Sequence, residues 1–213
     1  MPRKLPYLAC LGALLAAAPA RAAAVDIQIS DSLGHPAANA VVALTSQPGP
    51  MLASRLPMEA IVDQRHETFI PLVTILRKGG HVIFTNNDTT MHQVYSFSPI
   101  KQFEFEMDEG RRSTPVVFDK AGVASIGCNI HDHMITYVYV ADTPWTALTD
   151  GWGHVELADV PSGTYRVDVW HPQLMPGRPP PSTTLIVSGS TKFSFAVPLL
   201  ASSPVKRAHM GTY

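Results

Sequence analysis

The sequence has 213 residues, of which 46% are hydrophobic and 15% are charged, and its formal net charge at pH 7 is −1. A chain of this size and composition can bury a hydrophobic core without disulfide staples, which favours a globular protein of one large domain or two small ones. The near-neutral charge provides no basic surface for nucleic acid, so we expect no nucleic-acid partner.

Residues 1–22 have the three parts of a secretory signal peptide. Arg3 and Lys4 form a basic start, an apolar run follows from Leu8 to Ala18, and Ala20-Arg21-Ala22 is a small-x-small cleavage site. We therefore expect an exported protein, located in the periplasm. No later stretch approaches about 20 continuous apolar residues, so we expect no membrane anchor.

The sequence contains two cysteines, and cleavage after Ala22 removes Cys10 and leaves Cys128 alone in an oxidising compartment. Cys128 begins the stretch Cys-Asn-Ile-His-Asp-His-Met, which offers a thiolate, two imidazoles and a thioether over residues 128–134. Such soft and borderline ligands select copper and zinc over magnesium and calcium. A buried structural cysteine is the alternative, but the neighbouring histidines and methionine favour a metal site.

The first part of the mature chain predicts two strands and a linker. Residues 25–29 alternate apolar and polar as a half-buried strand does, turn residues follow at 31–36, and a second strand is expected at 40–45. We expect these two strands to form a hairpin. Residues 47–57 contain three prolines and one glycine and are predicted to be a linker.

Residues 58–141 predict closely spaced strands and no helix. In residues 103–107 the phenylalanines and the methionine should face a core and the glutamates should face water. Glu104, Glu106, Asp108 and Glu109 form either a solvated face or a docking patch for a cationic partner. Short strands separated by turns indicate a Greek-key sandwich or barrel. The expected strands are 60–62, 69–76, 81–85, 92–97, 103–107, 116–118, 123–127 and 135–140.

The C-terminal part resembles the carboxypeptidase-regulatory or transthyretin-like β-sandwich, through its Gly163-Thr164-Tyr165-Arg166-Val167 corner. That family begins with a hairpin similar to residues 25–45, so the resemblance implies that residues 58–141 are inserted into the sandwich; two tandem domains are the alternative. Trp170-His171-Pro172 is either a strand end with a structural histidine or a second metal or sugar site. The expected organisation is a signal peptide (1–22), the sandwich hairpin with its linker (23–57), the inserted domain (58–141), the rest of the sandwich (142–200) and a tail (201–213).

Residues 58–141 contain Phe69-Ile70-Pro71, Gly80, Val82-Ile83-Phe84, Asn86, His92 and the spacing Cys128-x-x-His131-x-x-Met134. By these residues the inserted segment resembles a cupredoxin, the fold of the small blue copper proteins. It is similar to the amicyanin-like form with a short ligand loop, and to exported proteins of the methylamine-utilisation type. The resemblance implies an all-β fold in which a Greek-key cupredoxin domain is combined with the transthyretin-like sandwich. It also implies one type 1 copper ion, held by His92, Cys128, His131 and the axial ligand Met134.

The chemistry of this ligand set agrees with copper. Two histidines, one cysteine and a weak axial methionine suit both Cu(I) and Cu(II). Structural zinc would use more thiolates or no methionine, c-type haem attachment would need C-x-x-C-H, and a dinuclear copper centre would need a second loop cysteine. His133 could replace His131, although the resemblance places it facing outward, and Met91 is either packing or a second thioether. Nothing indicates an oxyanion hole for cysteine catalysis.

One position departs from the family pattern. An Asn commonly follows the first histidine ligand and connects the two ligand loops, whereas this chain has Gln93. Hydrogen bonds to the residues that bind the metal orient them and tune the redox potential. Asn86 or Asn129 could supply the connection instead.

The resemblance implies a periplasmic electron-transfer protein and not an enzyme. Its partner would be a redox protein such as a c-type cytochrome or a periplasmic dehydrogenase, reached through a surface His131 ringed by apolar side chains. A copper carrier or chaperone is a second hypothesis, in which His133 and Met91 serve ligand exchange. A carbohydrate-binding or protein-binding module with an accessory copper site is a third.

Overall fold

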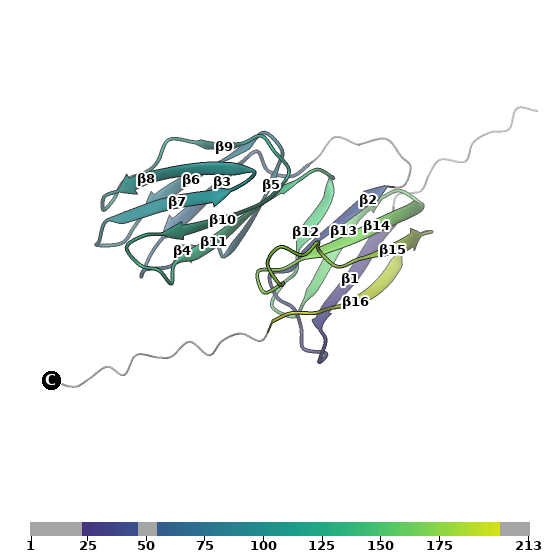
Figure 1. The fold of residues 1–213 in the computed structure, drawn as a ribbon. Coiled ribbons are helices and arrows are strands. Elements are labelled where there is room, and N and C mark those ends of the chain that lie inside the picture. Colours follow the sequence, from purple (N-terminus) through teal and green to yellow (C-terminus); the bar gives the residue numbers. More distant parts are fainter. Residues whose placement is uncertain (1–22, 47–54, 201–213) are drawn as a thin grey trace, which may run out of the picture.

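The computed structural model describes residues 23–46 and 55–200, and within these ranges the chain is all β, as expected (Figure 1). Sixteen strands form four sheets, which make up two units. The predicted signal peptide, the tail and residues 47–54 of the predicted linker lie outside the described residues. In the part of the chain that is described, no helix is long and apolar enough to cross a membrane.

The first unit combines strands from both ends of the described chain. One sheet has the order β13-β1-β16 and the other β12-β2-β14-β15. The strands are β1 (Ala23–Asp31), β2 (Val41–Ser46), β12 (Trp145–Leu148), β13 (His154–Val160), β14 (Gly163–Trp170), β15 (Ser182–Val187) and β16 (Thr191–Val197).

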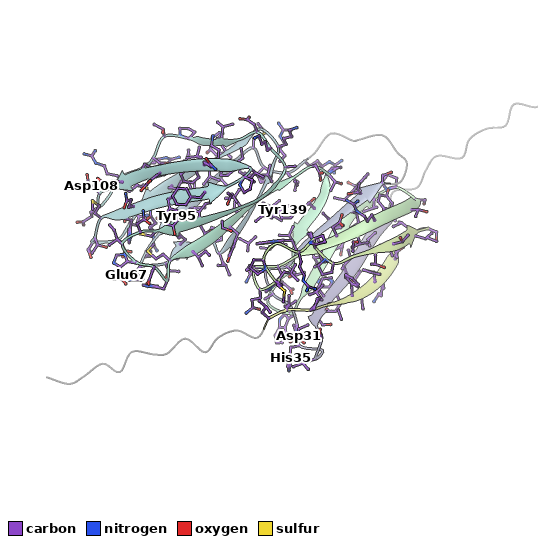
Figure 2. The ribbon with its side chains drawn as sticks, viewed as in Figure 1. Asp31, His35, Glu67, Tyr95, Asp108 and Tyr139 are labelled. Carbon is purple, nitrogen blue, oxygen red and sulfur yellow. The ribbon has the colours of Figure 1, made fainter. Side chains whose placement is uncertain are left out.

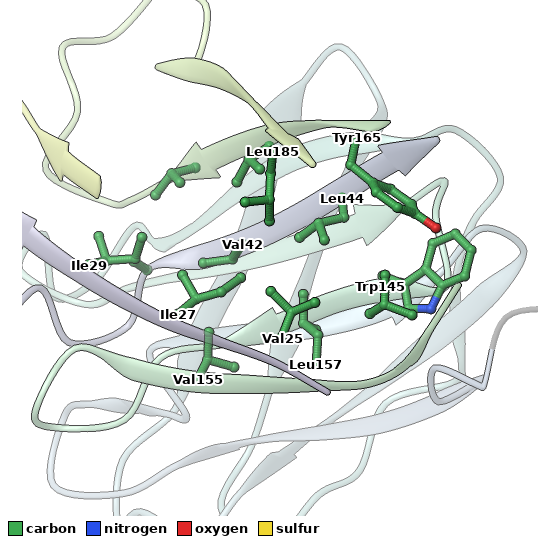
Figure 3. Packing of buried hydrophobic residues seen from close by; sticks show 14 of the residues in the cluster. Val25, Ile27, Ile29, Val42, Leu44, Trp145, Val155, Leu157, Tyr165 and Leu185 are labelled. Carbon is green, nitrogen blue, oxygen red and sulfur yellow. The ribbon is translucent and has the colours of Figure 1, made fainter. Parts of the chain in front are cut away.

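Aliphatic side chains from both sheets fill the space between them. Val25, Ile27 and Ile29 of β1 are fully buried because alternate residues of a strand point to the same face. Figure 3 shows these residues beside Leu44 of β2, and at one end of the core Trp145 meets Tyr165 edge to face, with ring centroids 5.4 Å apart. The Tyr165 hydroxyl donates a hydrogen bond to the Pro161 carbonyl, which fixes the turn between β13 and β14.

The expected hairpin of residues 25–45 is wrong. β1 pairs with β13 and β16, whereas β2 pairs with β12 and β14, so the two strands lie in different sheets. The turn itself is tight, since the Asp31 carboxylate accepts hydrogen bonds from the backbone N–H groups of Leu33 and His35. The ladder stops after a single bridge between Ser30 and Pro36, because the Ile29 N–H donates to the Gly153 carbonyl, and the chain crosses to the other sheet.

The second unit contains the strands between β2 and β12. Its sheets have the orders β5-β11-β10-β7-β8 and β4-β3-β6-β9. The strands are β3 (Glu59–Gln64), β4 (Phe69–Ile70), β5 (Val73–Arg77), β6 (Gly80–Asn86), β7 (His92–Ser98), β8 (Lys101–Met107), β9 (Val116–Phe118), β10 (Gly122–Cys128) and β11 (Ile135–Ala141).

The core of the second unit includes two of the four expected metal ligands. The ring centroid of Phe84 lies 5.8 Å from that of Phe103 and 5.8 Å from that of Phe105. Cys128 and Met134 belong to the same buried cluster. In β8, Phe103 and Phe105 turn towards this core, Met107 is buried, and the intervening glutamates are exposed, which confirms the alternation expected there.

Aromatic side chains connect the two units. Tyr137 and Tyr139 of β11 lie 5.3 Å and 6.2 Å from the Trp170 ring at the end of β14, measured between ring centroids. Burial raises the pKa of Tyr139 to about 12, and the nearby carboxylates of Asp142 and Asp168 add to this effect. The second unit therefore rests against the end of β14 as well as being joined to β12 through three residues.

Candidate metal centre

Three side chains that are distant in the sequence meet at one end of the second unit. His92 is the first residue of β7, Cys128 is the last residue of β10, and His131 lies in the loop that follows. The antiparallel pairing of β10 with β7 places Cys128 opposite Val94 and brings its side chain close to His92. The register between β7 and β10 therefore brings His92 and Cys128 together, and the short loop after β10 adds His131.

The three ligand atoms are close enough to share one ion. His92 Nδ1 lies 3.6 Å from Cys128 Sγ and 3.3 Å from His131 Nδ1. Within the described ranges, this is the only group of three or more His, Cys, Asp or Glu side chains whose ligand atoms all lie within 4.8 Å of one another. Bonds of about 2.0 Å to nitrogen and about 2.3 Å to sulfur, at angles of about 110–120°, require separations of about 3.3–3.5 Å between two nitrogens and about 3.5–3.7 Å between nitrogen and sulfur. The donor set and its spacing fit a small tetrahedral or trigonal metal ion such as copper.

The fourth expected residue, Met134, is buried next to this group. Its backbone N–H donates a hydrogen bond to the His131 carbonyl, which closes the loop, and its side chain lies in the same apolar cluster as Cys128. A thioether placed in such a cluster can pack and can also act as a soft ligand.

Asp88 lies behind His92 and was not anticipated from the sequence. Its Oδ2 is 3.1 Å from His92 Nε2, and the two oxygens accept hydrogen bonds of 2.8 Å and 2.7 Å from the backbone N–H groups of His66 and Glu67. Burial by itself raises the pKa of Asp88, but the hydrogen bonds from Glu67, His92 and His66 outweigh it, and the pKa lies below 3.8. The carboxylate is therefore charged and favours a proton on Nε2 of His92, which leaves Nδ1 to face Cys128 and His131.

Glu67 lies over the outer edge of the loop, and Figure 2 shows it at the surface of this unit. Its carboxylate oxygens are 3.5 Å from His131 Nε2 and 3.7 Å from His133 Nε2. The His131 side chain is 19% exposed and that of His133 is 60% exposed. His133 is therefore outside the compact group, next to Glu67.

The two segments that carry the histidines and the cysteine are connected through Asn129 and Gln93. The Asn129 N–H donates to the Gln93 carbonyl at 3.0 Å, and the side-chain amides of Gln93 and Asn129 both donate to Glu104 Oε1, at 2.8 Å and 3.2 Å. Asn86 takes no part, because its side chain binds the carbonyls of Thr90 and Met107. Asn86 and Asn129 were the two residues expected to connect the ligand loops, and the structure shows Asn129 in that role. It also adds Glu104, whose exposed position on β8 gave no indication of a link to the loop.

Apolar side chains next to the group are exposed to solvent. Met91 precedes His92, Ile130 precedes His131 and Ile135 follows Met134, and all three are more than one-third exposed.

His171, considered as a second metal site, has both ring nitrogens occupied. Nε2 lies 2.9 Å from the Ala38 carbonyl and Nδ1 accepts a hydrogen bond of 3.0 Å from the Gln173 N–H. It is one wall of a cavity of about 580 Å³, which Leu33, Leu72 and Leu199 also line and which is separate from the His92 group. These bonds give His171 a structural role at the strand end.

Comparisons with known proteins found similarity only at the level of structure, because neither a protein-family model nor a curated protein matches the sequence. A purple cupredoxin from Nitrosopumilus maritimus is 23% identical, with a TM-score of 0.35, over 38% of this chain and 99% of that one. The copper-containing nitrite reductase of Thermus scotoductus is 21% identical, with a TM-score of 0.37, over 44% of this chain and 25% of that one. Amicyanin from Paracoccus versutus is 21% identical, with a TM-score of 0.35, over 47% of this chain and 97% of that one. In each case the similarity covers less than half of this chain.

Proposed function

We propose that the protein is a periplasmic electron carrier with one type 1 copper ion held by His92, Cys128 and His131, with Met134 as a weak fourth ligand. The observation that carries the proposal is the group of two imidazole nitrogens and one thiol sulfur whose ligand atoms all lie within 4.8 Å of one another. Copper, when bound, supplies a one-electron couple, and this donor set suits both of its oxidation states.

The surrounding residues keep the ligand geometry fixed. Asp88 orients His92, the Asn129–Gln93 and Glu104 bonds hold the loop against β7, and the buried cluster around Cys128 excludes water. A ligand cage that is held by hydrogen bonds and packing changes little when the charge of the ion changes, which favours rapid electron transfer.

The exposed edge of His131 provides the shortest path between the ion and a partner. Ile130, Ile135 and Met91 are exposed apolar residues close in the sequence to the proposed ligands, and they offer apolar surface on which a redox protein, such as a c-type cytochrome or a periplasmic dehydrogenase, can dock. The protein turns over no substrate. We assign it to the methylamine-utilisation type of exported cupredoxin, and the first unit to the transthyretin-like sandwiches.

The visible spectrum of the Cu(II)-loaded protein tests this function. We expect an intense thiolate-to-copper absorption that is lost in Cys128→Ala and retained in the matched variant His133→Gln, which changes a neighbouring imidazole outside the group. A colourless Cu(II) complex of the wild-type protein would refute the proposal.

A copper carrier is the second candidate, and the position of Glu67 and His133 next to His131 favours it. Transfer of Cu(I) to a competing chelator separates the two functions. Metal that leaves within seconds indicates a carrier, whereas retained metal combined with fast electron self-exchange indicates an electron-transfer protein.

A further inference from the structure

We propose that the outer face of the β5-β11-β10-β7-β8 sheet, around Tyr95, is a second docking surface, at which a redox protein with a basic surface exchanges electrons with the metal centre. The inference rests on the proposed function and adds a partner site separate from the exposed edge of His131. An electron carrier receives its electron from one protein and delivers it to another. Two docking surfaces of different chemistry allow each partner to be recognised separately.

A row of four residues crosses this face of the sheet. Gly127 of β10 pairs with Ile135 of β11 on one side and with Tyr95 of β7 on the other, and Tyr95 pairs with Glu104 of β8. Residues directly opposite each other point to the same side of a sheet. That side is away from the core, because Ile135 and Glu104 are exposed whereas Val94, next to Tyr95 in β7, is fully buried. Figure 2 shows Tyr95 on this sheet.

The Tyr95 ring lies against the backbone of Gly127. A Cβ added to Gly127 would be 2.8 Å from the Tyr95 hydroxyl oxygen and 2.9 Å from its Cζ, so a side chain at this position would displace the ring. Gly127 is the residue before Cys128, and a single peptide bond joins the two. The ring is thus in contact with the stretch of backbone that leads directly to the thiol of the proposed metal centre.

This contact provides an electron path that does not pass through His131. The path runs from the Tyr95 ring to the Gly127 backbone and then through covalent bonds to Cys128 Sγ. In each transfer one electron leaves one redox centre and enters the other, and Tyr95 itself is neither oxidised nor reduced. Phe97 extends the aromatic surface, since its ring centroid lies 5.2 Å from that of Tyr95 and the residue is 67% exposed.

The charge of this face selects a basic partner. The outward-facing positions of β7, β8 and β10 include two carboxylates, those of Glu104 and Glu106, and no lysine or arginine. Among the described residues neither glutamate forms an ion pair, because Glu104 accepts hydrogen bonds from the neutral amides of Gln93 and Asn129. Negative charge beside an exposed aromatic surface is complementary to a partner with lysines around its redox centre.

The rate of electron transfer to a lysine-rich c-type cytochrome tests the path. The full mature protein, loaded with copper and reduced, is mixed with the oxidised cytochrome at low ionic strength, and its oxidation is followed by stopped flow. We expect Tyr95→Leu and Glu106→Lys each to slow the reaction by about tenfold, the second through lost electrostatic steering. Tyr95→Phe retains the ring and should react at the wild-type rate. Glu156→Lys makes the same charge change at an exposed position of β13 in the first unit, and as the matched control it should also react at the wild-type rate.

Binding is measured separately from the redox reaction. The isotope-labelled apoprotein is titrated with the same cytochrome, and the backbone amide signals are followed by NMR. We expect the largest changes at Tyr95, Phe97 and Glu104, and we expect them to weaken as the salt concentration rises, because exposed charges are then screened. This readout does not require copper.

The outcomes separate this inference from the proposed function. Wild-type transfer rates in Tyr95→Leu, or equal slowing in Glu106→Lys and Glu156→Lys, overturn the second docking surface and leave the copper site standing. Amide changes confined to Met91 and Ile130 overturn it as well. An altered visible spectrum in Tyr95→Leu also overturns it, because Tyr95 then positions the metal ligands. Glu106→Lys changes an exposed side chain and keeps the test decisive if Tyr95→Leu does not fold. A wild-type protein that never develops the thiolate-to-copper absorption overturns the proposed function and the electron path with it.

Discussion

Asp88 Oδ2 lies 3.1 Å from His92 Nε2, while the other ring nitrogen of His92 faces Cys128 Sγ at 3.6 Å. The imidazole is thus held on one side by a charged carboxylate and directed on the other towards the thiol. This places Asp88 at the centre of a network that joins His92 to the turn at His66 and Glu67.

Replacing Asp88 should destabilise the apoprotein. In Asp88→Asn an amide NH₂ replaces one of the two accepting oxygens, so one of the donors now bound to the carboxylate becomes unpaired. We expect a loss of about 1–3 kcal/mol in the free energy of unfolding, measured by urea denaturation without metal. Asp108→Asn, at an exposed carboxylate, is the control and should change stability by less than about 0.5 kcal/mol. Equal stabilities of the two variants would contradict the role given to Asp88.

Glu104 should support metal binding although it is exposed. Glu104→Gln removes the negative charge that receives the side-chain amides of Gln93 and Asn129 and so weakens the connection between β7 and the loop. We expect metal affinity to fall by about 10-fold to 100-fold, measured by competition with a chelator. The control is Glu106→Gln on the same face of β8, which should retain wild-type affinity. A similar loss in both variants would indicate a general charge effect.

Gly153 is required for the structure of the first unit. Its φ is +73°, and an added Cβ would collide with the Ile29 carbonyl oxygen and lie 2.9 Å from the Ala37 nitrogen, both of which are backbone atoms. Gly153→Ala should therefore cost on the order of 3 kcal/mol of unfolding free energy. Gly151→Ala, two residues earlier, meets no atom within 4 Å and serves as the matched control. Thermal unfolding of both variants checks this, and a stable Gly153→Ala protein would show that the turn adjusts.

His171 should make stability depend on pH. Burial lowers the pKa of His171 below its ordinary value of 6.5, against the opposing effect of its hydrogen bond to the Ala38 carbonyl. Below pH 6.5 the unfolded chain binds a proton at His171 while the folded chain does not, so stability falls as the pH decreases towards the folded pKa.

The variant His171→Gln tests that prediction. Its stability should change less than that of the wild type as the pH is lowered from 7 through this window, measured by urea unfolding at each pH. His133→Gln, which alters an exposed imidazole of the other unit, should retain the wild-type pH dependence. Identical pH profiles for the wild type and His171→Gln would refute the prediction.

Metal should stabilise the fold through Cys128. A ligand that binds only the folded state adds about 2.7 kcal/mol when its free concentration is about 100 times the Kd. We expect Cu(II) or Zn(II) to raise the melting temperature of the wild-type apoprotein, and chelation to reverse the change. Cys128→Ser should lose most of this increase while His133→Gln keeps it. An equal increase in Cys128→Ser would place the bound metal elsewhere.

The sequence predicted local features that depend on side-chain periodicity. The all-β class, the half-buried strand at 25–29 and the alternation of β8 follow from the period of two that a strand imposes, and the structure confirms them. The turn at residues 31–36 was also predicted correctly, but the chain passes from it into the other sheet and does not form the expected hairpin. Asp31 closes the turn as expected for a hairpin, whereas the Ile29 N–H bonds to the Gly153 carbonyl and both edges of β1 pair with β13 and β16, so β2 lies in the other sheet.

By itself the sequence determined that the chain is all β and that Cys128, His131 and Met134 lie within one loop-sized segment, because strand periodicity and chain proximity are local properties. The family resemblance named His92 as a partner of this loop, and the structure places the two together. Only the tertiary structure decided that Asp88 lies behind His92, that Glu67 covers the outer edge of the loop and that Glu104 joins Gln93 to Asn129. Each of these contacts joins residues of different strands or turns, and its distance depends on which strands pair and in what register. Pairing is a property of the whole sheet, since a strand edge takes the partner that completes the core, and no short stretch of sequence contains that information.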